Sequence, residues 1–222
     1  NDVTLNSVSN DGNKPVITAN GQNYTFDAVL YATGRKPNTA NIGLENTDIT
    51  TNERGAIVVN DTCESSVPGV YAVGDVNGGP QFTYISLDDF RIVFGALTGN
   101  GQYTLKDRKN IPYTTFLTPP LARVGLTEED AINKGYTVKT KEMLVATMPR
   151  AHVNDYLKGA FKIVVNAENN LILGATLYSQ GAEELINLIK MAMDNNIPYT
   201  YFKNQIFTHP TMAENLNDLC NF

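Results

Sequence analysis

The sequence predicts a mixed fold in which an α/β portion is followed by an α+β domain with an antiparallel sheet. Three observations lead to this prediction. Short apolar runs bounded by glycine and asparagine fill the first half of the chain. A polar, turn-rich stretch follows at residues 100–115. Three β-prone runs and then amphipathic helices follow in the second half, which places a domain boundary near residue 110.

The first half begins with a predicted hairpin. β-prone residues flank Asn20-Gly21, and this dipeptide favours a two-residue turn because both central positions need positive φ. Residues 28–32 form an apolar run typical of a buried strand. Two further short strands are expected at residues 55–60 and 69–73.

Residues 85–99 change to a helical period, with Gly99 as the stop signal. One face of this helix carries its apolar residues, which are Ile85, Leu87, Phe90, Val93, Phe94 and Leu97.

The second half is predicted to contain strands at residues 137–146, 159–166 and 171–179, the last two joined at Asn169-Asn170. A short helix over 127–135 begins at the N-cap Thr127, and a last helix covers 211–219. The helix over 182–196 has an inward face formed by Leu185, Ile186, Ile189, Ala192 and Met193.

Composition excludes several classes of protein. The net charge of −6 and pI near 4.9 argue against a nucleic-acid partner, which requires a basic surface. No apolar run reaches the roughly 20 residues of a membrane span, so we expect no membrane partner and a cytoplasmic location. Cys63 and Cys220 form no CxxC pair, so no metal site is predicted, and reduced thiols are favoured over a long-range disulfide.

Two glycine-containing stretches are candidate ligand sites. In VLYATGRKPNT, Gly34 allows the backbone to approach a flat ligand with Arg35 outside it; the alternative is a strand end and a solvated loop. In GVYAVGDVNGG, a short strand ends at Gly74-Asp75, where Asp75 can accept hydrogen bonds from ribityl or ribose hydroxyls. The alternative there is a plain Asp-Gly turn, and no GxGxxG fingerprint is present.

The stretch FTHPTMAE contains His209 and also has two interpretations. Thr211 and Glu214 fit a capping box for the last helix. Alternatively, Glu214 orients His209 as a proton carrier, and both roles are compatible because they use different atoms. His152, the other histidine, is interpreted as a surface residue.

The three motifs YATGRKPN, VYAVGDV and HPTMAE, in this order, resemble the flavoprotein pyridine nucleotide–disulfide oxidoreductases. The resemblance covers essentially the whole chain. It implies a Rossmann-like FAD/NAD(P)-binding portion, with residues 1–40 as the tail of the NAD(P)-binding domain and 41–110 as the second segment of the FAD domain. Residues 111–222 would be the dimerisation domain through which a homodimer forms.

The resemblance also implies roles for individual residues. Asp75 matches the family's flavin aspartate, and His209 with Glu214 matches the acid–base pair that serves the other subunit's flavin and disulfide. The implied reaction passes a hydride from NAD(P)H through FAD to a cysteine pair, and then reduces a small disulfide, an oxidant or a metal-ion acceptor. Phe82 and Tyr84 follow the flavin aspartate and could pack near its ring or in the core.

The chain departs from the family pattern in lacking the GxGxxG and CxxxxC segment. Because it also begins at Asn1, we expect a C-terminal fragment that does not hold FAD firmly and is inactive alone. The stretches PQFTYISLDDFRIV and FLTPPLARVGLTEEDA resemble the branch of mercuric reductase and of reactive-chlorine and hypothiocyanite defence, although a single Cys220 disfavours a mercury role. The alternative function is a non-catalytic homodimerisation module.

Overall fold

The computed structural model describes residues 2–222, which divide into two compact units. The first unit extends to Gln102, and the second comprises Tyr103–Phe222. Each unit is described separately below. In the described part of the chain, no helix has both the length and the apolar character needed to cross a membrane.

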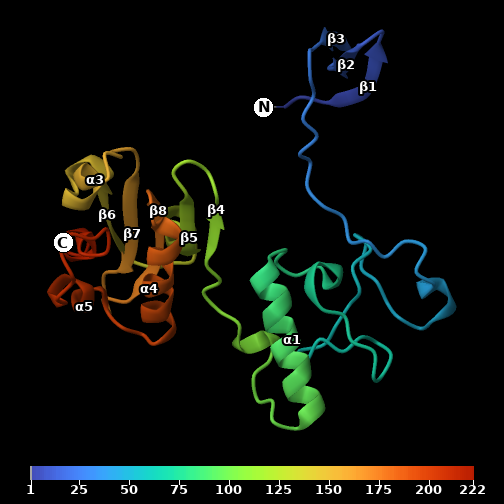
Figure 1. Ribbon diagram of the computed structural model, residues 1–222. Coiled ribbons are helices and arrows are strands. Elements are labelled where there is room, and N and C mark those ends of the chain that lie inside the picture. The colour runs from blue at the N-terminus through green and yellow to red at the C-terminus, as the bar shows by residue number, and fades with distance from the viewer. Residues whose placement is uncertain (1) are drawn as a thin grey trace. The chain divides into compact units, whose positions relative to one another are not determined.

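The first unit begins with a three-stranded antiparallel sheet in the order β1-β2-β3. The strands are β1 (Leu5–Asp11), β2 (Lys14–Ala19) and β3 (Gln22–Thr25), drawn in blue in Figure 1. Asn20 and Gly21 connect β2 to β3 with φ values of 50° and 76°. The predicted Asn-Gly hairpin is therefore confirmed.

Three other strands predicted in this unit do not form. Residues 28–32 have no strand partner, and Leu30 and Tyr31 are largely exposed; Figure 1 draws this segment without an arrow. Residues 55–60 and 69–73 contribute only isolated bridges, from Ile57 to Thr51 and from Tyr71 to Glu64. A buried strand needs neighbours that satisfy its backbone and cover both faces, and the first unit supplies neither here.

The helix α1 (Thr83–Thr98) confirms the predicted helix, and its C-cap Gly99 has a φ of 72°. The predicted apolar face is wrong as a buried face. Only Ile85 of that set is buried, together with Ile92 and Asp89. Four members of the predicted face are exposed, namely Leu87 at 50%, Phe90 at 54%, Phe94 at 57% and Leu97 at 65%. No element of the first unit covers them.

The second unit contains a five-stranded antiparallel sheet in the order β4-β5-β8-β7-β6. Its strands are β4 (Tyr113–Thr115), β5 (Leu121–Gly125), β6 (Val138–Leu144), β7 (Ala160–Asn166) and β8 (Ile172–Tyr178). The last three confirm the predicted strands, and Asn170 turns between β7 and β8 with a φ of 63°. The short strands β4 and β5 were not predicted.

The second unit contains five α-helices. They are α2 (Glu128–Asn133), α3 (Pro149–Val153), α4 (Ala182–Asp194), α5 (Tyr199–Asn204) and α6 (Asn215–Leu219). The predicted helices at 127–135 and 182–196 are confirmed by α2 and α4. Thr127 caps α2 through a capping box with Asp130.

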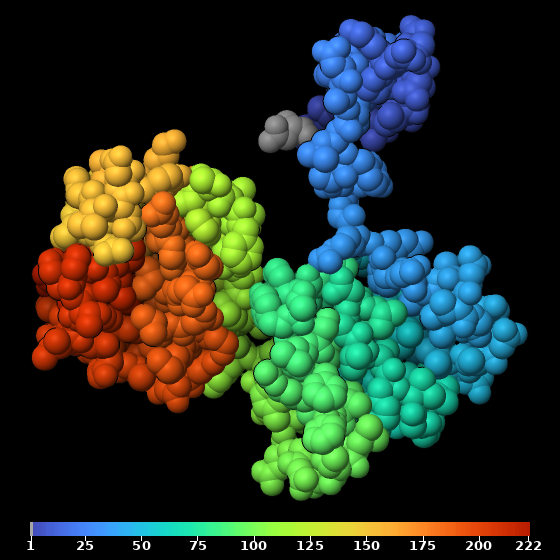
Figure 2. Space-filling model, viewed as in Figure 1, coloured from blue at the N-terminus to red at the C-terminus, as the bar shows by residue number. Residues whose placement is uncertain are grey.

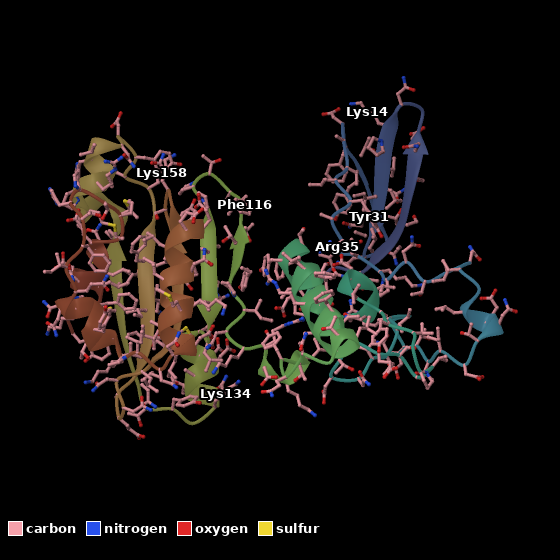
Figure 3. The ribbon with its side chains drawn as sticks, turned by 60° about the horizontal axis from the view of Figure 1, so that its bottom comes forward. Lys14, Tyr31, Arg35, Phe116, Lys134 and Lys158 are labelled. Atoms are coloured by element: carbon pink, nitrogen blue, oxygen red, sulfur yellow. The ribbon has the colours of Figure 1, made fainter. Side chains whose placement is uncertain are left out.

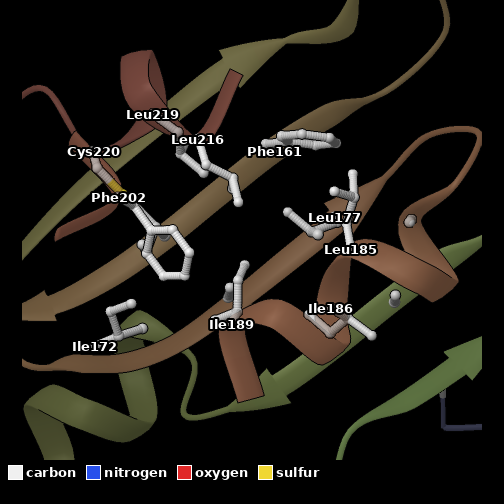
Figure 4. Packing of buried hydrophobic residues seen from close by; sticks show 14 of the residues in the cluster. Phe161, Ile172, Leu177, Leu185, Ile186, Ile189, Phe202, Leu216, Leu219 and Cys220 are labelled. Atoms are coloured by element: carbon white, nitrogen blue, oxygen red, sulfur yellow. The ribbon is translucent and has the colours of Figure 1, made fainter. Parts of the chain in front are cut away.

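A single hydrophobic core holds the second unit together. Alternate residues of β5, β7 and β8 point to one face of the sheet, where α4, α5 and α6 supply the opposing side chains (Figure 4). The fully buried members include Phe161, Ile163, Leu177, Ile186, Ile189, Leu216 and Leu219. In Figure 2 the second unit is coloured from yellow-green to red, and the side chains of its sheet and helices fill the space between them.

Candidate active site

The predicted pair His209 and Glu214 is brought together in the loop before α6. His209 Nδ1 lies 2.8 Å from Glu214 Oε2. The imidazole side chain is 68% exposed, whereas the carboxylate side chain is 19% exposed. The partly buried Glu214 carboxylate thus orients the exposed imidazole through a hydrogen bond to one ring nitrogen.

Glu214 makes both of the contacts expected from the sequence, with a different oxygen for each. Oε1 accepts the Thr211 backbone N–H at 3.1 Å, while Oε2 faces His209. The Thr211 hydroxyl in turn accepts the Glu214 backbone N–H at 3.2 Å and donates to the Thr208 carbonyl at 2.8 Å. The reciprocal Thr211–Glu214 bonds have the pattern of a capping box.

The regular part of α6 begins later than predicted, at Asn215 and not at Thr211. Residues 212–214 form a tighter turn, because the N–H groups of Asn215 and Leu216 bond the carbonyls of Met212 and Ala213, three residues back. Asn215 reinforces this turn, because its side-chain amide donates to the carbonyls of Thr211 and Met212.

The hydrogen bond determines which nitrogen of His209 is available for chemistry. An ionised carboxylate only accepts hydrogen bonds, so Nδ1 carries the hydrogen and Nε2 is left as the reactive position. The hydrogen bond from His209 is also the main cause that holds the pKa of Glu214 below its ordinary value, with a further contribution from the Thr211 N–H. Glu214 is therefore ionised at neutral pH, and His209 can take up or release a proton at Nε2.

The end of α6 is tied to the sheet by Lys141 of β6. Its ammonium group donates to the carbonyls of Asp218 at 2.8 Å and Asn221 at 2.5 Å. These are among the carbonyls that a helix leaves unsatisfied at its C-terminus, and a cation there also complements the helix dipole.

In the first unit, Gly74 and Asp75 open a short 3-10 helix, η2 (Gly74–Asn77). Gly74 has a φ of 72°, and a Cβ atom at this position would lie 2.7 Å from Ser86 Oγ of α1. Both the backbone conformation and the close approach to α1 require glycine here.

Arg35 contacts the second candidate stretch. Its guanidinium donates to Asp75 Oδ2 at 2.9 Å and to the Gln81 carbonyl at 2.8 Å, just before α1 (Arg35 is labelled in Figure 3). Gly34 precedes it with a φ of 96° and open space around its Cβ position. The two glycine-containing motifs therefore meet, which neither motif alone could have indicated because they lie 40 residues apart.

Sequence reasoning missed Asp89, a completely buried carboxylate on α1. It accepts the Gly74 N–H at 2.7 Å and the Asn77 side-chain amide at 2.9 Å. Asp89 thereby fixes the loop that carries Asp75. A charged residue on the buried side of an otherwise apolar helix face was the available signal.

Phe82 and Tyr84 stack on each other, with ring centroids 5.1 Å apart and planes 10° apart. Partial burial raises the pKa of the Tyr84 hydroxyl above its ordinary value, so this group stays protonated at neutral pH. Phe82 is the N-cap of α1 and Tyr84 lies in its first turn, so both rings are at the N-terminus of this helix.

The residues around Asp75 fit the sugar-like chain of a flavin. The Asp75 carboxylate remains 43% exposed beside Arg35, and its backbone is held by the Gly74–Asp89 contact. An exposed and oriented carboxylate is the acceptor that ribityl hydroxyls require.

The remaining candidates do not join either site. Cys63 and Cys220 are buried, and burial raises the pKa of the Cys220 thiol to about 12. A neutral, buried thiol is a poor ligand for a soft metal ion. His152 is exposed on α3, as predicted, and its Nε2 contacts the Ala146 carbonyl.

Comparison with known proteins gives two family matches. Residues 2–89 match the family described as pyridine nucleotide-disulphide oxidoreductase, and residues 111–220 match its dimerisation domain. The chain is 45% identical over 222 residues to the probable pyridine nucleotide-disulfide oxidoreductase RclA of Escherichia coli (strain K12), covering 98% of this chain and 50% of that protein.

The chain is also 36% identical over 218 residues to a mercuric reductase of Staphylococcus aureus, covering 96% of this chain and 40% of that protein. Its fold resembles the solved structure of the HOCl-induced flavoprotein disulfide reductase RclA from Escherichia coli. The TM-score is 0.92 at 44% identity, over 98% of this chain and 50% of that one. The chain thus spans about half the length of the relatives it matches.

Proposed function

Because the chain belongs to the pyridine nucleotide-disulphide oxidoreductase family, we propose that it supplies the acid–base histidine and the dimerising domain of an FAD- and NAD(P)H-dependent disulfide-type oxidoreductase. The observation that carries this proposal is the contact between His209 Nδ1 and Glu214 Oε2 at 2.8 Å, which leaves an exposed Nε2.

The proposed role of His209 is proton transfer during thiol–disulfide interchange. When bound, FAD takes a hydride from NAD(P)H and passes the electron pair on to a disulfide of two cysteines. One of the resulting thiols must lose its proton to attack the substrate, and the sulfur that leaves must gain one. Nε2 of His209 accepts the first proton and delivers the second, while Glu214 stabilises the imidazolium between the two steps.

The residues of the first unit have binding roles in this proposal. Asp75 would accept hydrogen bonds from the ribityl hydroxyls, with Gly34, Arg35 and Gly74 shaping its surroundings. Phe82 and Tyr84 would lie against the flavin portion of the site. The proposed acceptor is a small disulfide or oxidant; the buried, protonated Cys220 offers no thiolate to a metal-ion substrate.

The test uses FAD-loaded protein expressed from the full reading frame that encodes this chain. In His209→Ala we expect flavin reduction by NAD(P)H to keep nearly its rate in stopped-flow spectra. The following interchange step should slow by roughly 10²–10⁴-fold, the usual contribution of a general acid–base group. His152→Ala is the matched control. Equal loss of both steps would contradict the role of His209.

A homodimer formed through residues 111–222 is part of the same proposal. The segment that leads to His209 supports it, because Ile206 is 96% exposed and lies three residues before an exposed imidazole. Such a segment is suited to reach a neighbouring subunit's site. Sedimentation of the chain at micromolar concentration should give a dimer, and a monomer would contradict this.

A second candidate function is a non-catalytic homodimerisation module. The core of the second unit favours it, since all of the buried residues of that core belong to the second unit. In that case His209→Ala would leave both redox steps unchanged while the dimer persisted. We propose a cytoplasmic location for either function.

A further inference from the structure

The contact between His209 and Glu214 depends on the shape of an exposed loop. Isolated ion pairs at a protein surface are weak, because each side chain loses rotamer freedom and water competes for the contact. With 68% of its side chain exposed, the imidazole has little packing of its own. Its orientation must therefore come from the backbone that carries it.

The bonds within this loop fix only its tip. The Thr211 hydroxyl and the Glu214 carboxylate make reciprocal contacts inside the turn, and Asn215 donates to carbonyls only three and four residues earlier. Phe207, Met212 and Ala213 pack against the core from either side of the histidine. None of these hydrogen bonds joins the chain entering the loop to the chain leaving it.

Asn217 makes that connection. Its side-chain Nδ2 lies 2.6 Å from the Phe202 carbonyl, 2.9 Å from the Gln205 carbonyl and 3.3 Å from the Lys203 carbonyl. These three carbonyls lie at the C-terminal end of α5, where a helix has few backbone donors to offer; the Phe202 carbonyl also accepts the Gln205 N–H, at 3.4 Å. One half-buried amide of α6 therefore closes the loop of residues 205–217 at its base.

We propose that Asn217 is a positioning residue for His209: by holding the end of α5 to α6, it keeps Nδ1 of His209 against Glu214 and Nε2 facing outward. The catalytic meaning of this inference rests on the proposed function of His209. The geometric claim is independent of that function, because it concerns only the state of the imidazole in the folded chain.

Two histidines in the whole chain allow a direct test by NMR. Long-range ¹H–¹⁵N spectra of the 222-residue chain, at a pH where imidazole is neutral, report which ring nitrogen carries the hydrogen. The parent chain should show the Nδ1–H form at His209. Asn217→Asp keeps the shape of the side chain but removes its donors, and Asn217→Ala removes both. Each should shift His209 toward the Nε2–H form that free imidazole favours in water.

The Glu214 carboxyl gives a second readout that a merely structural role would not move. Its ¹³C titration midpoint should rise toward the ordinary value in both variants, because the hydrogen bond from His209 is the main cause of its low pKa. His152 should be unchanged throughout. Asn195→Asp is the matched control, since the amide of this exposed residue serves a single carbonyl within α4, that of Met191.

An unchanged His209 tautomer in folded Asn217→Ala would overturn the proposal. A change in Asn217→Asp alone would also overturn it, because the new charge and not the lost donor would be the cause. If Asn217→Asp fails to fold, the Asn217→Ala spectrum decides by the same criterion. Failure of the proposed function appears elsewhere, as unimpaired interchange in His209→Ala, and would leave the NMR result standing.

Discussion

The helices α1 and α4 share a sequence pattern but have opposite surroundings. Both were predicted from apolar residues recurring at helical spacing, and both form. Helix α4 buries its apolar face, with Leu185, Ile186 and Ile189 in the core of the second unit. Helix α1 leaves Phe90 and Phe94 more than half exposed. Periodicity therefore predicts a helix and the face that seeks a partner, but not whether the same unit contains that partner.

The largest difference between the two helices should appear on truncation of an apolar side chain. Ile189→Ala in α4 removes a fully buried side chain and should lower the free energy of unfolding of the second unit by about 2–5 kcal/mol. Phe94→Ala in α1 should change the stability of the first unit by less than about 0.5 kcal/mol. Urea unfolding followed by circular dichroism and by unit-specific amide signals measures both. Comparable losses would show that the α1 face is covered.

A smaller effect is expected from the single buried polar anchor of α1. Asp89→Ala removes the acceptor of the Gly74 N–H and the nearer of the two acceptors of the Asn77 amide, which keeps only the Ala72 carbonyl at 3.3 Å. This should cost about 1–3 kcal/mol locally. The amide hydrogen of Gly74 should then exchange faster with solvent. Asp88→Ala removes a neighbouring charge and should leave Gly74 protected. Unchanged exchange in Asp89→Ala would mean that the loop is held by other contacts.

The smallest effect concerns pH and is confined to the second unit. A carboxyl whose pKa is lowered on folding stabilises the folded state above its ordinary pKa, and this stabilisation is lost as pH falls through the lowered value. As pH falls, the free energy of unfolding of the second unit should therefore decrease more steeply in the parent chain than in His209→Ala, where Glu214 has lost its partner. Thermal unfolding between neutral pH and about pH 3 measures this, and parallel curves for the two proteins would contradict it.

Local signals in the sequence were sufficient for much of the second unit. Thr127 and Asp130 marked the start of α2, and Asn169-Asn170 marked the β7–β8 turn. The strands β4 and β5 escaped prediction because they are short and because Pro119 and Pro120 interrupt the pattern between them. The pairing of His209 with Glu214 was predictable because both residues lie within one turn of chain.

Contacts between distant segments were not predictable in the same way. Arg35 and Asp75 are far apart in sequence, and no periodic pattern connects them. The residues 28–32 were predicted as a buried strand because they are apolar, but burial depends on neighbouring strands that local sequence does not specify. The contacts of Asn217 were not predictable for the same reason, since its side chain bonds three carbonyls at the end of α5 that lie 12 to 15 residues earlier.

The hydrogen bonds from Lys141 to the carbonyls of Asp218 and Asn221 have a practical consequence for labelling. Any polypeptide fused after Phe222 starts one residue beyond a carbonyl that this lysine holds. A bulky or rigid fusion at that point would pull on α6, and through α6 on the turn that contains Glu214. Affinity tags and fluorophores for studies of His209 therefore belong at an exposed position outside the second unit, such as the Asp11–Lys14 turn.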